Sequence, residues 1–171
     1  MRDTFADDAG QLANLAAFRG QLQQRDFPAA QTGLAPESAT LTDSVAGPSA
    51  CRSCHEKQYA VWSTSLHAQA WKTLLAKGTQ VDPACQVCHT TAYGLPGGFA
   101  SLKATPDRVN VSCEDCHGPS ARHVKEPKIK TLYGSMPRDC RTCHDAENSP
   151  HFEFNQFYSK IQHADKKEPK P

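Results

Sequence analysis

The chain has 171 residues, of which 38% are apolar, and a mean hydropathy of -0.61, so a conventional side-chain core is poorly supplied for a body of this size. Its 19 Lys and Arg and its 18 Asp and Glu leave a formal net charge of +1, which excludes nucleic acid as a charge-driven partner. No apolar run is long enough to span a membrane, and the acidic start has no secretory signal. We therefore expect a chain that does not span a membrane, either processed or excerpted from a longer one.

The first expected element is an amphipathic helix, which we take with its flanks as a region over residues 1–26. Asp7 or Asp8 is placed to cap its N-terminus, and the helix runs to about Arg25. Apolar side chains recur at helical spacing on one side of it. These are Leu12, Leu15, Ala16, Phe18 and Leu22.

Residues 27–50 form the second expected region, an extended linker. Pro, Ala, Ser, Thr and Gly dominate it, and it carries almost no charge. Such a composition is typical of a connector rather than of a packed element. The third region, residues 51–171, contains every cysteine of the chain.

All eight cysteines of this third region occur in pairs with one spacing, and a histidine follows each pair directly. A chance placement of histidine after all four pairs has a probability of about 5 in a million, so the repeat is a C-x-x-C-H signature of covalent haem attachment. The four motifs are Cys51, Cys54 and His55; Cys85, Cys88 and His89; Cys113, Cys116 and His117; and Cys140, Cys143 and His144.

Haem chemistry explains the spacing. Two thiols three residues apart on one helical turn can both add to vinyl groups of one porphyrin, and the next residue then offers its imidazole to the iron. Structural zinc would use the cysteine pairs but not a histidine after each of them. A thioredoxin-like site needs one pair only, and a disulfide framework usually has irregular spacing. We therefore expect four covalently bound haem c groups.

The remaining histidines match the number of irons. They are His67, His123, His151 and His163. Four spare imidazoles for four irons predict bis-histidine ligation, and Met136 is the one internal methionine available as a sulfur ligand. A spare histidine can also be an ordinary surface or core residue.

The positions of the spare histidines indicate ligation across the chain. His67 lies in a predicted helix, on one face with Trp71, and Gly78 is placed to end that helix. His123 follows His117 by only a few residues, with a Gly-Pro step between them. We therefore expect it to bind the iron of another haem than the one on His117. The same reasoning discourages pairing His151 with His144.

Several of these motifs, in their order, resemble the cytochrome c-554 family of tetrahaem electron carriers. The likeness covers about residues 51–163 and is more specific than any single haem motif. The segments that carry it are Cys51-Arg52-Ser53-Cys54-His55, Ser65-Leu66-His67-Ala68-Gln69-Ala70, Cys85-Gln86-Val87-Cys88-His89, Tyr93-Gly94-Leu95-Pro96-Gly97-Gly98-Phe99 and Cys113-Glu114-Asp115-Cys116-His117-Gly118-Pro119, with His123 after it.

The resemblance implies a mainly α fold, with little or no sheet, in which closely stacked haems form the core. It also assigns distal ligands: His123 to the haem on His55, His67 to the haem on His144, and His163 to the haem on His117. For the haem on His89, the family resemblance implies an open iron. The histidine count instead favours closure by His151, and we expect closure.

The chain is also similar to the haem-bearing tails that follow calcineurin-like phosphoesterase domains. Such a tail has a helix like that at residues 7–25 before its first haem motif. The phosphoesterase metal motifs Gly-Asp-x-x-Asp and Gly-Asn-His-Glu do not occur in this sequence. Hydrolase activity is therefore not supported.

The expected function is electron transfer between other redox proteins, in the periplasm or outside the cell, where haem attachment of this type takes place. Two alternatives stay open. One is a small redox enzyme that acts on a nitrogen oxide or hydroxylamine at an open second haem. The other is a self-assembling subunit of an extracellular cytochrome filament, or of another larger complex.

Overall fold

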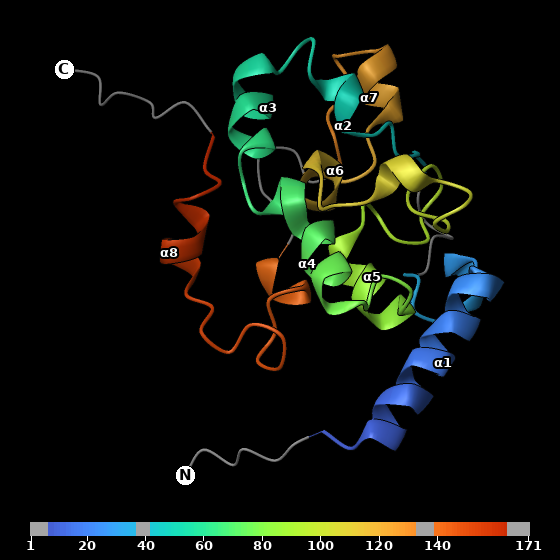
Figure 1. Cartoon of the computed structure of the whole chain (residues 1–171). Helices are drawn as coiled ribbons and strands as arrows, with labels where there is room; N and C mark the ends of the chain where they lie inside the picture. Colours follow the sequence, from blue (N-terminus) through green and yellow to red (C-terminus); the bar gives the residue numbers. More distant parts are fainter. Residues whose placement is uncertain (1–6, 37–41, 133–138, 164–171) are drawn as a thin grey trace.

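A computed structural model describes residues 7–36, 42–132 and 139–163 of the chain. Short helices joined by long loops make up the fold (Figure 1). Within the described ranges, β-type pairing is limited to an isolated antiparallel bridge between Thr90 and Val109. The prediction of a mainly α protein is confirmed.

The α-helices are α1 (Ala9–Arg25), α2 (Pro48–Cys51), α3 (Glu56–Ser63), α4 (Ala70–Lys77), α5 (Pro83–His89), α6 (Cys113–His117), α7 (Ala121–Lys125) and α8 (Phe154–Tyr158). Single turns of 3-10 helix lie at Ala29–Gln31, His67–Gln69, Pro106–Arg108 and Cys140–Thr142. None of the helices in the described ranges has the length and apolar character that a membrane crossing requires.

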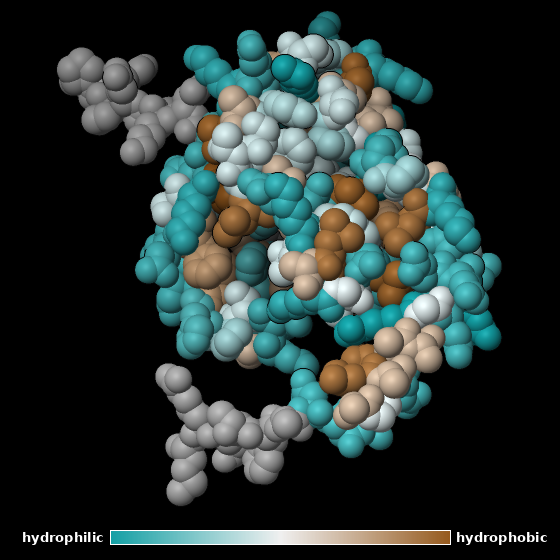
Figure 2. Space-filling model, in the orientation of Figure 1, coloured by the Kyte–Doolittle hydropathy of each residue, from teal (hydrophilic) through white to brown (hydrophobic). Residues whose placement is uncertain are grey.

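Helix α1 begins where the sequence predicts. The Asp8 carboxylate accepts a hydrogen bond from the Gln11 N–H at 2.9 Å, which satisfies one of the unpaired donors of the first turn. Most of the predicted apolar side of α1, however, is exposed to solvent, with Leu22 half-buried against α5, and no residue of this helix is buried. Figure 1 shows α1 extending from the body, and Figure 2 shows apolar side chains on its surface.

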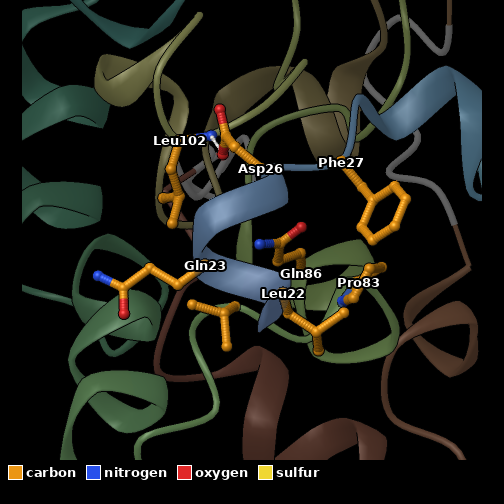
Figure 3. A pocket seen from close by; sticks show the side chains of 8 residues that line it. Leu22, Gln23, Asp26, Phe27, Pro83, Gln86 and Leu102 are labelled. Atoms are coloured by element: carbon orange, nitrogen blue, oxygen red, sulfur yellow. Dashed lines mark hydrogen bonds between the residues drawn. The ribbon is translucent and has the colours of Figure 1, made fainter. Parts of the chain in front are cut away.

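The end of α1 is attached to the body through Asp26. This residue adopts the left-handed conformation, with φ of 46°, and its carboxylate accepts hydrogen bonds from the Ser101 hydroxyl at 2.7 Å and from the Leu102 N–H at 3.0 Å. Figure 3 shows Asp26 and Leu102 at the edge of a cavity of about 10 Å³ between α1 and α5. A cavity of this size holds about one water molecule, so it is not a ligand site.

The segment that leads to the first haem motif is held by Glu114, whose side chain is only 3% exposed. Its carboxylate accepts hydrogen bonds from the N–H groups of Ala46 at 2.9 Å, Gly47 at 2.7 Å and Ser120 at 2.9 Å. Burial raises the pKa of Glu114, and these three donors oppose that rise. The residues before the first motif are thus anchored to α6 in the third motif.

The apolar core is small. Phe99 is fully buried and stacks on Tyr93 with ring centroids 5.9 Å apart, and Ala29 packs with them. Trp71 touches this cluster from α4, with its ring 6.3 Å from Phe99. Few other apolar side chains of the described residues are buried. This agrees with the low apolar content of the sequence.

The helix predicted to include His67 is interrupted, because His67 lies in a 3-10 turn before α4. A continuous helix would bond the Trp71 N–H to the His67 carbonyl. Instead the Trp71 N–H donates to Asn110 Oδ1 at 2.9 Å, and the His67 carbonyl accepts from the Val111 N–H at 3.1 Å. A distant loop therefore interrupts the predicted helix between His67 and Trp71.

Candidate haem-binding sites

Each C-x-x-C-H motif lies on a single helical turn. The His55 N–H donates to the Cys51 carbonyl at 2.9 Å, and the His144 N–H donates to the Cys140 carbonyl at the same distance. The second and third motifs lie in α5 and α6. All four motifs therefore bring two thiols and one imidazole to the same turn, as haem attachment requires.

The structure brings histidines from distant segments together in pairs. The ring centroids are separated by 6.0 Å for His55 and His123, 6.1 Å for His67 and His144, and 6.0 Å for His117 and His163. Two imidazoles bound to opposite sides of one metal ion, with bonds of about 2.0 Å, have centroids about 6 Å apart. These three pairs therefore have the separation that an iron between the rings would need.

Hydrogen bonds at the Nδ1 atoms leave the Nε2 atoms available to a metal. A carbonyl can only accept, so an Nδ1 that bonds a carbonyl carries its proton, and this arrangement is typical of metal-bound histidines. Nδ1 donates to the carbonyl of Ala70 from His89 at 2.8 Å, of Ile129 from His123 at 2.7 Å, and of Ile161 from His163 at 2.8 Å. Nδ1 of His144 lies 3.2 Å from the Ser149 hydroxyl.

The pair of His67 and His144 is also electrostatically suited to a metal. Burial, and secondarily the nearby His144, lower the pKa of His67, and burial lowers the pKa of His144. Both shifts favour the neutral imidazole, which is the form that binds metals.

His89 and His151 are not brought together. The His89 ring is held by the Ala70 carbonyl at the start of α4. His151 is exposed, and within the described residues it makes no ring contact with His89. The structure thus assembles three of the four histidine pairs expected above. Met136, the alternative sulfur ligand, lies outside the described residues.

The first and third motifs abut each other. The Cys51 and Cys113 thiols interact, which lowers the pKa of Cys51 and raises that of Cys113. Helices α2 and α6, which carry them, pack together. Haems attached at these cysteines would therefore be neighbours.

Residues 110 and 111 form a link that the sequence did not indicate. The Asn110 N–H donates to the His89 carbonyl at 3.0 Å, and the Val111 N–H donates to the His67 carbonyl at 3.1 Å. Two successive residues thus hold histidines that belong to two different expected haems. Asparagine tolerates the left-handed conformation found here, but nothing in the sequence shows which segments it connects.

Comparisons with known proteins agree with this site. Residues 50–118 match the family described as "Cytochrome c554 and c-prime". "Cytochrome c-554" of Nitrosomonas europaea (strain ATCC 19718 / CIP 103999 / KCTC 2705 / NBRC 14298) is 32% identical over 88 residues, and the match covers 43% of this chain and 37% of that relative. No solved structure matches the chain. The resemblance inferred from the motifs is confirmed, and the chain spans little more than a third of the relative's length.

Proposed function

Residues 50–118 carry the sequence of the cytochrome c-554 family, and on this basis we propose that the chain is a tetrahaem c-type cytochrome that passes electrons between redox proteins. Haem c supplies an iron that takes up and releases one electron at a time. The cysteines of the four motifs hold the four haems through thioethers, and the histidine of each motif is the proximal ligand. No bond of a substrate is made or broken.

The three histidine pairs carry this proposal. His123, His67 and His163 act as distal ligands for the irons on His55, His144 and His117. A closed bis-imidazole iron has no position for a substrate, so it is suited to electron transfer and not to catalysis. The Nδ1 hydrogen bonds of His123, His144 and His163 keep these rings oriented in both oxidation states.

Two contacts indicate which of the proposed haems lie close together. Helices α2 and α6, which carry Cys51 and Cys113, pack together, which supports close approach of the first and third haems. Residues 110 and 111 join the backbones of His89 and His67, which supports close approach of the second and fourth. We infer two neighbouring haem couples, through which electrons enter and leave.

The partners are other redox proteins, and the site of action is the periplasm or the cell exterior. Thioether attachment of haem takes place outside the cytoplasmic membrane. The proposed location follows from that chemistry and from the cytochrome c-554 likeness.

The first prediction concerns the number of haems. In denaturant, the purified protein keeps all its haem and has the polypeptide mass plus four haem groups, because both thiols of each motif form thioethers. Mass spectrometry and the absorbance of the pyridine haemochrome measure this. A stoichiometry below four contradicts the proposal.

A second candidate function is favoured by His89. Its ring lacks a histidine ring opposite it within the described residues, so the iron there is the candidate for an open position. Such an iron binds a small ligand such as nitric oxide, nitrite or hydroxylamine, and the protein would then be a small redox enzyme.

The second prediction separates the two functions. If His151 closes the iron on His89, cyanide binds the ferric protein slowly, and His151→Ala creates one fast-binding, high-spin haem. If the iron is open, one haem of the unmodified protein binds cyanide fast and His151→Ala has no effect. Stopped-flow absorbance and electron paramagnetic resonance (EPR) distinguish these outcomes, and the second outcome supports the enzyme.

A further inference from the structure

Asn110 occupies a strained position between the segments that surround His89. Its φ is 74°, in the left-handed region that is uncommon for residues other than glycine. Its Oδ1 accepts from the Trp71 N–H at 2.9 Å, its N–H donates to the His89 carbonyl at 3.0 Å, and its carbonyl accepts from the Thr91 hydroxyl at 2.9 Å. The Asn110 side chain thus bonds Trp71 in α4. Its main chain bonds His89, at the end of α5, and Thr91, two residues later.

The ring of His89 depends on both of these attachments. Its Nδ1 donates to the Ala70 carbonyl at 2.8 Å, and Ala70 directly precedes the Trp71 that Asn110 caps. Helix α4 receives no hydrogen bond from the side chain of its own N-cap residue, so the Asn110 side chain takes that role. Asn110 therefore holds both the backbone of His89 and the start of α4, where the Ala70 carbonyl accepts the hydrogen bond from the His89 ring.

We propose that Asn110 is a positioning residue that orients His89 toward the iron of the haem on Cys85 and Cys88. The inference rests on the proposed function, because it requires a haem at this motif. A hydrogen bond from Nδ1 to a carbonyl makes the imidazole a more basic ligand. A more basic ligand stabilises ferric iron, so Asn110 holds the potential of this haem down.

The hydrogen bond at the next residue, Val111, should not depend on the Asn110 side chain. The Val111 N–H reaches the His67 carbonyl through main-chain atoms alone. Glycine at residue 110 adopts the left-handed conformation without strain, so Asn110→Gly keeps the two main-chain bonds of that residue and the Val111 bond. It removes the side-chain acceptor only.

The test is a spectroelectrochemical titration of the holoprotein, with haem stoichiometry measured on each sample. In Asn110→Gly, the potential of one haem rises by about 59 mV, a tenfold change in its redox equilibrium, and the other haems keep their potentials. Asn110→Asp keeps the acceptor for the Trp71 N–H and adds a negative charge at a residue whose main chain bonds that of His89, so the potential of that one haem falls.

Asp26→Gly is the matched control. Asp26 also has a left-handed backbone, with φ of 46°, and its side chain accepts hydrogen bonds from another segment, at Ser101 and Leu102. We expect this variant to lower the melting temperature and to leave every haem potential unchanged. A role of Asn110 in stability alone would make the two glycine variants behave alike.

The outcomes separate the inference from the proposed function. Fewer than four haems in the unmodified protein contradicts the proposed function. Four haems with unchanged potentials in Asn110→Gly, or with equal shifts in Asp26→Gly, overturns the role of Asn110 alone. Asn110→Asp carries the test if Asn110→Gly does not accumulate, and a rise or no change in the potential of that haem then overturns the role.

Discussion

Replacing His67 with alanine is expected to convert one haem iron in four from low spin to high spin. His67 faces His144 with ring centroids 6.1 Å apart, and alanine removes its imidazole from the iron on His144. Water or an empty position then replaces a strong-field ligand. The three other haems keep the spin states that they have in the unmodified protein, because their ligands come from other segments. EPR spectroscopy and the absorbance of the ferric protein count the affected iron.

Leu66→Ala is the matched control for this change. Leu66 precedes His67 and is 82% exposed, so its loss disturbs the same turn without removing a ligand. The control should keep the spin states of the unmodified protein. An unchanged spin count in His67→Ala would remove His67 from the ligand set, whereas a new high-spin signal in both variants would indicate a general disturbance of the turn.

Preventing haem attachment is expected to unfold most of the chain. Few apolar side chains of the described residues are buried, the largest being Phe99, Tyr93 and Leu74, and burial contributes only about 25 cal/mol per Å² of apolar surface. Ordering costs about 1–2 kcal/mol per residue in backbone entropy alone. A cofactor that binds the folded chain only supplies the missing free energy of folding.

Circular dichroism of the apoprotein, produced without haem attachment, measures this effect. The helical signal of the holoprotein should be largely lost, and proteolysis should cut within residues 51–163. A variant that lacks the fourth pair, Cys140→Ala with Cys143→Ala, is the graded control and should lose order mainly around α8. A compact, helical apoprotein would contradict a core built on haem.

The local features of the fold follow from the sequence because they depend on neighbouring residues. Asp8 caps α1 as predicted, and Gly78 ends α4 with φ of 63°, since capping needs one side chain or one left-handed glycine at a set position. The haem motifs are likewise local, because one helical turn suffices to place two thiols and an imidazole. The mainly α class, by contrast, was expected from the family resemblance that these motifs carry.

The helical periodicity of the sequence did not predict two features, the exposure of α1 and the start of α4, because contacts with distant segments determine both. Most of the apolar side of α1 is exposed although its spacing is that of an amphipathic helix, because the periodicity of a helix does not say whether another element covers it. His67 lies outside α4 because Asn110 and Val111 take the hydrogen bonds of a continuous helix.

The amino-acid sequence alone predicts covalent haem attachment. It has four C-x-x-C-H motifs, four spare histidines and too few apolar residues for a core without a cofactor. Only the tertiary structure decided which rings meet, namely His55 with His123, His67 with His144 and His117 with His163. In the described residues, it also shows no ring contact between His151 and His89. Residues 110 and 111 bond the backbones of His89 and His67. The physical reason is that covalent attachment requires residues adjacent in sequence, whereas pairing across an iron requires residues adjacent in space.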